Sequence, residues 1–460
     1  MKRIIYEKAS RMESTLQELF DWHTRPGALD RLTPPFMPIR VIDPPTGIQN
    51  GCRARLEVKI GPWKKEWQAE HQDYIQGKQF KDVQLSGPFR HWEHTHLFSD
   101  GSSPTCILRD HVEFELPLSW VSHYLLKPYI HHELEELFSY RHRVIFNDLL
   151  AHQRAKGEEM PQRILVAGGT GFIGRHLIPF LTTGGHEVSR LVRHPVESKG
   201  TDIYWNPAKG ELNPELLEGF DAVINLAGEN ISQGKWTPEV KNRIIESRVK
   251  GTHLLSQTLA GLKKKPTVFI SASAIGYYGD RDDEIMYVDK APGNGFLAEV
   301  CWKWEQAADP ARAAGIRVVH PRIGIVLSPD GGILKKMLST FKWGLGGTLG
   351  TGKHYMSWIT IDDLIYAMHY VLHRKSIQGP LNLVGPNPVT NAEFTKILSR
   401  VLWRPALLPT PAILLKALFG EMADDVIFAS KRVRPIQLLH SQFEFAYPDL
   451  EGALRHLLGK

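Results

Sequence analysis

Three glycines at three-residue steps are the residues of this chain whose spacing points most directly to a chemistry. Gly168, Gly171 and Gly174 stand in "VAGGTGFIG", after a short apolar segment and before a helical one. One glycine permits a tight turn, one lets the backbone approach a pyrophosphate, and one lets the helix pack closely on the strand. The first turn of the helix then offers free N–H groups to phosphates. The pattern predicts a dinucleotide-binding site.

The end of the next predicted strand, "HEVSRLVRHP", indicates which dinucleotide binds. Arg193 and His194 end it and Arg190 precedes them, whereas Glu187 stands at its beginning. An acidic residue at the end of this strand binds a ribose 2′-hydroxyl, and an arginine binds a 2′-phosphate through its planar fork of donors. NADP is therefore the predicted cofactor. The alternative is that these arginines are solvated surface residues.

These motifs require a parallel sheet to hold them, and the residues from 162 to 330 predict one. The apolar segments "RILVAGG", "HEVSRLVR", "DAVINLAG", "TVFISASA" and "IRVVHPRIGIVL" alternate with helical segments. This alternation is typical of an α/β doubly wound Rossmann fold. Residues 331–460 form a looser block of helices and loops.

Residues 1–155 predict a separate α+β domain. Strand-like runs from "CRARLEVKIG" to "CILRDHVEFEL" follow one another at hairpin spacing after an early helical segment, and an amphipathic helix, "HHELEELFSYRHRVIFNDLLAHQR", closes the block. Arg154 to Gln162 is the predicted linker. With "ALDRLTPPF", this order resembles the helix-grip, START-like and polyketide-cyclase-like superfamily. The resemblance implies a hydrophobic ligand between sheet and helix, and the alternative is a plain accessory domain.

A second resemblance is more specific. "GGTGFIG", "NLAGENI", "SASAIGYYG", "FLAEVCWKWE", "RIGIVLSPDGGIL" and "SWITIDDL" occur in an order and spacing similar to the epimerase-family, atypical branch of the extended short-chain dehydrogenase/reductases. The resemblance implies NADP binding and a C-terminal substrate lobe over residues 331–460. It also implies the roles of single residues. The pyrophosphate would be lined by Gly168, Gly171, Phe172, Ile173 and Gly174, the 2′-phosphate would meet Arg193, and the rest of the cofactor would contact Leu226, Ala227 and Ser271.

The reaction centre departs from the usual pattern of that family. Short-chain dehydrogenases carry a Tyr and a Lys four residues apart on one helix face, with a Ser that binds the substrate oxygen. Ser273 matches the serine, but Phe296 and Val300 occupy the other two positions and cannot move a proton. Tyr278 and Glu299 are the candidate replacements. Their alternatives are a structural tyrosine and an exposed pair of Glu299 with Lys303.

A histidine-rich run, "HWEHTH", raises the question of a metal. On a strand, His94 and His96 share one face, and His91 takes the other with Glu93. Three histidine ligands cannot easily converge from both faces. The sequence predicts no metal site here.

Composition limits the class of protein. Of 460 residues, 42% are hydrophobic and 23% are charged. The net charge is +6, and the basic residues are scattered among the acidic ones, so no nucleic-acid partner is expected. Cys52, Cys106 and Cys301 lie far apart, which fits a reducing cytoplasm. The longest apolar run is broken by Pro411 and Lys416, so no membrane span is expected.

Two hypotheses of function follow. The first is an NADP-dependent oxidoreductase or epimerase-like enzyme that acts on a small-molecule substrate with an altered proton donor. Its basis is the complete cofactor motif and Ser273. The alternative is a non-catalytic NADP-binding sensor or ligand-responsive interaction protein, because the Tyr–Lys pair is missing. The sequence favours the first.

Overall fold

The computed structural model describes residues 3–102, 104–116, 120–155, 162–194, 201–232 and 235–460. The chain divides into two compact units. The first consists of Met1–Lys156, Ile178–Gly185 and Gly459, and the second of Gly157–Leu177, His186–Leu458 and Lys460. Most of the predicted linker lies outside the described residues.

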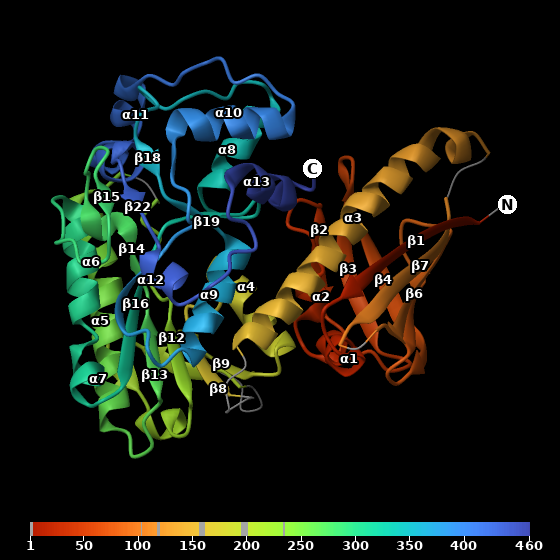
Figure 1. Cartoon of the computed structure of the whole chain (residues 1–460), viewed down its shortest axis with the longest axis horizontal. Coiled ribbons are helices and arrows are strands. Elements are labelled where there is room, and N and C mark those ends of the chain that lie inside the picture. Colours follow the sequence, from red (N-terminus) through yellow and green to blue (C-terminus); the bar gives the residue numbers. More distant parts are fainter. Residues whose placement is uncertain (1–2, 103, 117–119, 156–161, 195–200, 233–234) are drawn as a thin grey trace. The chain divides into compact units, whose positions relative to one another are not determined.

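The first unit is built on an antiparallel sheet whose described strands follow the order β1-β7-β6-β5-β4-β3-β2. Their bounds are β1 (Ile4–Met12), β2 (Ile39–Asp43), β3 (Arg53–Ile60), β4 (Trp63–Ile75), β5 (Gln79–Ser86), β6 (His91–Asp100) and β7 (Cys106–Glu115). The helices are α1 (Leu16–Thr24), α2 (Ala28–Arg31) and α3 (Trp120–Ala155). The long helix α3 packs against β1 and α1 (Figure 1).

Alternating burial explains the strands of this unit. Every second residue is buried in β6 from Trp92 to Phe98 and in β7 from Cys106 to Phe114, so one set of side chains forms an inner face. The predicted strands and the closing helix are present. The strand β1 was not predicted, because charged residues stand between its apolar ones.

The second unit contains the predicted doubly wound sheet. Parallel strands follow the order β10-β9-β8-β12-β13-β16-β20, in which the direction of chain progression reverses between β8 and β12. This is the Rossmann order with one added strand, and its switch point is where such folds bind ligands. The bounds are β8 (Arg163–Ala167), β9 (Glu187–Val192), β10 (Ile203–Asn206), β12 (Ala222–Asn225), β13 (Val268–Ser271), β16 (Arg317–Ile323) and β20 (Gly379–Leu383), with β11 (Glu211–Leu212) and β14 (Ser273–Ala274) at the sides.

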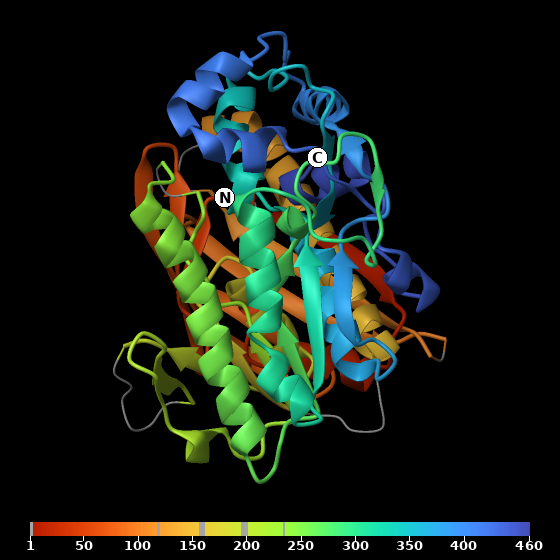
Figure 2. The same ribbon diagram turned by 90° about the vertical axis from the view of Figure 1, so that its left-hand side faces the viewer.

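Helices cover both faces of this sheet. One face carries α5 (Pro238–Gly261), α6 (Phe296–Gln306) and α7 (Asp309–Ala313), and the other carries α9 (Ile361–His373) (Figure 1). Figure 2 shows α5 and α6 side by side over the strands. The start of α5 is set locally, because Thr237 accepts a hydrogen bond from the N–H of Val240 and Pro238 occupies the first helical position.

The remaining elements of this unit are short. Of α4 (Gly174–Thr183), only the first turn up to Leu177 belongs to this unit. The other helices are α8 (Gly332–Lys342), α10 (Asn391–Leu402), α11 (Ala412–Phe419), α12 (Ile436–His440) and α13 (Leu450–Leu458). Three strand pairs join them: β15 (Ile285–Met286) with β22 (Arg432–Val433), β17 (Ile325–Leu327) with β19 (Trp358–Thr360), and β18 (Tyr355–Met356) with β21 (Val389–Thr390). In the described part of the chain, no helix is long and apolar enough to cross a membrane.

Candidate functional site

The glycine turn lies at the switch point, after β8. Gly168 has a φ of +79°, and a Cβ there would lie 2.7 Å from the carbonyl carbon of Leu226. A Cβ on Gly174 would lie 2.5 Å from the carbonyl oxygen of Gly168. Both positions therefore require glycine, the first for its conformation and both for close approach of backbone. The turn thus packs against the segment that follows β12.

The exposed part of the turn is open to a ligand. Thr170 and Gly171 are exposed, and α4 begins at Gly174, after which the N–H groups of Arg175 and His176 donate to the carbonyls of Gly171 and Ile173. Phe172 packs its ring on Gly331, where a Cβ would lie 2.3 Å from the ring. Ile173 is half-buried. The structure brings these residues together at one edge of the sheet, as the sequence predicted.

The end of β9 holds the arginines that suggested NADP. Arg190 is engaged with Asp202, its Nε and Nη2 donating to the two carboxylate oxygens at 2.8 and 2.6 Å. Arg193 is exposed just beyond the strand, and no ion pair among the described residues engages it. Of the two, Arg193 is therefore the one available to a 2′-phosphate.

The segment after β12 is positioned by a residue that the sequence analysis did not single out. Asn225 is buried, donates to Thr252 Oγ1 at 2.8 Å and accepts from the backbone N–H of Ala227 at 3.1 Å. This side chain shapes the turn that carries Leu226 and Ala227, both half-buried. The asparagine that opens "NLAG" was the available signal.

Two of the three reaction-centre candidates, Ser273 and Tyr278, lie in a buried polar network. The Ser273 hydroxyl donates to Glu305 Oε1 at 2.8 Å, and Glu305 accepts from Nε and Nη2 of Arg322 at 2.9 and 3.0 Å. The Tyr278 hydroxyl accepts from Arg322 at 3.0 Å and donates to Asn382 at 2.5 Å. Burial raises the pKa of Tyr278, although the Arg322 cation beside it acts in the opposite direction. Tyr278 therefore holds the network together as a neutral donor and acceptor.

Two positions on α6 show what replaced the Tyr–Lys pair. Phe296 and Val300 are buried in an apolar cluster. The ring of Phe296 packs edge-on against that of Trp236, with 5.0 Å between the ring centroids. Glu299 is about half exposed and accepts a hydrogen bond from Lys303 at 2.6 Å. This contact is the exposed pair of Glu299 with Lys303 that the sequence offered as the alternative to a catalytic role. Glu305, one and a half turns further along, is the carboxylate that reaches Ser273. Neither Glu305 nor Arg322 was predicted as a site residue, because each reaches Ser273 or Tyr278 only through the tertiary fold.

Ser271, the other serine of this segment, ends β13 and is fully buried. Its carbonyl accepts from Nδ1 of His320 at 3.3 Å, while Nε2 of His320 accepts from Arg312 at 3.0 Å. Both contacts fit a neutral imidazole. Burial lowers the pKa of His320 to about 4.

This burial predicts a loss of stability in mild acid. The imidazole of His320 titrates near 6.5 in the unfolded chain and near 4 in the folded chain, so the unfolded chain binds more protons between these values. The part of the free energy of unfolding that depends on neutral His320 is fully present above about pH 6.5, and it falls as the pH is lowered towards 4. His320 is expected to contribute about 2 kcal/mol of this loss by pH 5. Urea unfolding at pH 7 and pH 5 measures it: His320→Gln should reduce the difference, and the exposed His440→Gln should not. Equal pH dependence in both variants would contradict the assignment.

The fold and the turn define a dinucleotide-binding Rossmann protein, and the comparisons with known proteins specify its family. A model described as the NAD dependent epimerase/dehydratase family matches residues 164–384, and one described as a domain of unknown function, DUF1731, matches residues 410–457. An epimerase family protein of Mycobacterium bovis is 40% identical over 292 residues, which are 63% of this chain and 96% of that protein. The chain belongs to the NAD dependent epimerase/dehydratase family.

Two solved structures extend the comparison. The nucleoside-diphosphate sugar epimerase from Corynebacterium glutamicum is 33% identical with a TM-score of 0.81, and the match covers 99% of this chain and 90% of that one. The human epimerase family protein SDR39U1, solved with NADPH, is 32% identical with a TM-score of 0.59, and the match covers 64% of this chain and 99% of that one. The similarity to the Corynebacterium protein therefore includes the first unit.

Proposed function

We propose that this chain binds NADP at the glycine turn and uses it for hydride transfer on a small-molecule substrate of the nucleotide-sugar or carbonyl type. The prediction of the cofactor is confirmed within the family, because the human relative was solved with NADPH. The observation that carries the proposal is the turn itself, where Gly168 and Gly174 bring bare backbone to the switch point. Arg193 supplies the cation for the 2′-phosphate. The name of the Corynebacterium relative supports the substrate class.

Ser273 is the proposed group for binding the substrate oxygen. Its hydroxyl donates to Glu305, so its oxygen can act towards a substrate hydroxyl only as an acceptor. Glu305 in turn is fixed by Arg322. A carboxylate linked to a serine hydroxyl can take up the proton of a substrate hydroxyl during oxidation, and in its protonated form can return it during reduction, where the usual tyrosine is absent. Residues 331–460 are proposed as the substrate lobe.

Ser273→Ala is expected to lower turnover by about 100-fold and to leave NADPH affinity within about twofold, as for loss of one positioned polar group. Fluorescence titration measures the affinity, and NADPH oxidation over a panel of carbonyl compounds and nucleotide sugars measures turnover. Ser339→Ala, on the exposed side of α8, is the control. Unchanged turnover in Ser273→Ala would exclude Ser273 from the reaction. NADPH binding without oxidation of any substrate would exclude the oxidoreductase.

The second candidate function is an NADP-binding sensor without catalysis. The observation that favours it is the apolar cluster at Phe296 and Val300, because side chains packed there cannot transfer protons. A sensor requires that NADPH and a second ligand alter each other's affinity by the same factor. Calorimetry with both ligands distinguishes the two functions.

The helix-grip assignment of the first unit is also a proposal. The support is the element order, strands followed by the long helix α3. The proposed apolar ligand has less support, since the inner face of the sheet carries the buried polar side chains of His94, His96 and Asp110 beside apolar ones. These polar groups suit a charged or metal ligand better than an apolar one.

A further inference from the structure

Three side chains with metal-binding atoms converge on the inner face of the first unit. Asp82 lies on β5, and His94 and His96 lie on β6; one ligand atom from each lies within 4.8 Å of the others. The Oδ2 atom of Asp82 is 3.3 Å from Nε2 of His96 and 3.6 Å from Nδ1 of His94. Both histidines are buried.

Strand pairing creates this convergence. Asp82 stands directly opposite His94 in the β5–β6 ladder, and His96 follows two residues later on the same face. The prediction of no metal site rested on the pattern of one strand. That pattern places His94 and His96 on one face, as in the structure, but contains no information on the carboxylate of Asp82 from the neighbouring strand.

A second carboxylate orients the two histidines. Asp110 on β7 accepts from Nε2 of His94 at 2.9 Å, and its same oxygen lies 2.7 Å from Nδ1 of His96. Its other oxygen accepts from Nε2 of His142 at 2.6 Å. Because an ionised carboxylate only accepts, the nitrogens of His94 and His96 that face Asp110 carry hydrogen. The nitrogens that face Asp82 are the ones that a metal ion would bind, and Nε2 of His96, which hydrogen-bonds to Asp82 Oδ2 at 3.3 Å, would release its hydrogen when the ion binds.

We propose that Asp82, His94 and His96 bind a divalent transition-metal ion such as Zn²⁺. Imidazole nitrogen and carboxylate oxygen are ligands that Zn²⁺ uses, at about 2.0–2.2 Å, which places neighbouring ligand atoms of a tetrahedral site about 3.3 Å apart. The measured 3.3 and 3.6 Å separations from Asp82 match that spacing. Three protein ligands leave one position for water or a further ligand.

The charges around these three side chains, and the access of Asp82 to solvent, favour a divalent cation. Asp82 and Asp110 supply two negative charges, and the positive charges near them are those of Arg141 and of a protonated His96, whose proton a bound metal ion would replace. The second oxygen of Asp82 lies 2.8 Å from Nε2 of His71, which fixes the carboxylate. About a quarter of the Asp82 side chain is exposed, so an ion can reach the site from solvent.

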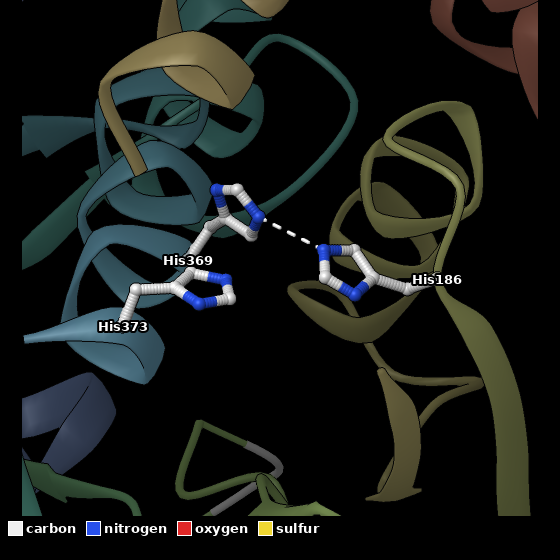
Figure 3. Close-up of side chains that lie close together, drawn as sticks. All are labelled: His186, His369 and His373. Atoms are coloured by element: carbon white, nitrogen blue, oxygen red, sulfur yellow. Dashed lines mark hydrogen bonds between the residues drawn. The ribbon is translucent and has the colours of Figure 1, made fainter. Parts of the chain in front are cut away.

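A second cluster consists of His186, His369 and His373 (Figure 3). Its ligand atoms also lie within 4.8 Å of one another, but its hydrogen bonds and charges favour a metal ion less. The backbone N–H of Gln162 donates to Nδ1 of His186, so Nε2 of that ring carries hydrogen and donates to His369 at 3.0 Å. The cluster contains no carboxylate, and the charges of Arg317 and Arg374 act on His373. A cation is therefore less favoured there, and the cluster serves as an internal control.

The test uses the full chain, stripped of metal with a chelator and titrated with Co²⁺ and Zn²⁺. We expect one Co²⁺ per chain with visible d–d absorption of a four- or five-coordinate ion, displacement by Zn²⁺, and a higher Tm with metal. Asp82→Asn and His94→Gln should lose the band, and Asp110→Asn should weaken binding by about 10–100-fold. Two controls should keep the band: His91→Gln, on the opposite face of β6, and His369→Gln, in the second cluster.

Circular dichroism checks that each variant is folded, and elemental analysis gives the number of metal ions bound per chain. If His94→Gln does not fold, Asp82→Asn decides the question, because Asp82 is partly exposed and asparagine keeps its shape. Absence of stoichiometric Co²⁺ binding, or equal affinity in Asp82→Asn, would overturn the proposal. Loss of the band in His369→Gln with retention in Asp82→Asn would place the ion in the second cluster and overturn it as well.

Discussion

Replacing Glu305 by glutamine is expected to lower the free energy of unfolding of the second unit by about 3–5 kcal/mol. The side chain of Arg322 is 2% exposed, and Glu305 neutralises it through two hydrogen bonds. Glutamine retains the shape of glutamate but leaves the buried guanidinium without its counter-charge. Urea unfolding followed by tryptophan fluorescence measures the change.

Glu299→Gln on the same helix is the matched control. Its carboxylate is exposed and pairs with Lys303, so its removal should cost less than about 1 kcal/mol. If Glu299→Gln destabilises the unit as much as Glu305→Gln, burial of the Arg322 pair is not the cause. The same variant also tests the predicted catalytic role of Glu299: turnover should fall without loss of stability if that role is correct.

Gly174→Ala is expected to weaken NADPH binding by about 100-fold, the effect of displacing a binding element by about 1 Å. The added Cβ would meet the backbone of Gly168 and Gly169 at 2.5 to 2.7 Å, and backbone cannot move aside as a flexible side chain does. The turn and the start of α4 must separate, which moves the N–H groups that are proposed to bind the pyrophosphate. Isothermal titration with NADPH measures the change.

Two glycines of the same unit provide controls. A Cβ on Gly171 meets a single atom, at 3.1 Å, so Gly171→Ala should lose less affinity than Gly174→Ala. A Cβ on Gly261 meets nothing within 4 Å, so Gly261→Ala should bind NADPH normally. Full affinity in Gly174→Ala, with the substitution confirmed by mass, would remove the glycine turn as the cofactor site.

The sequence by itself determined the cofactor domain, because the information there is local. The turn at Gly168 depends on its own positive φ, and the alternation of strands with helices depends on the periodicity of neighbouring residues. The same applies to the strands of the first unit, where His94 and His96 were correctly placed on one face. The loss of the Tyr–Lys pair at Phe296 and Val300 was likewise visible in the sequence.

Only the tertiary structure decided which polar side chains meet. Ser273 reaches Glu305 and Arg322 across 32 and 49 residues of chain, through the packing of α6 and the pairing of β14 with β16. Asp82 meets His94 through the register of β5 on β6. Local pattern carries no information on register or on packing between distant segments, because a shift of one residue would turn each side chain to the opposite face. The Rossmann fold of the cofactor domain could therefore be predicted from the sequence, and the partners of Ser273 and the proposed metal ligands could not.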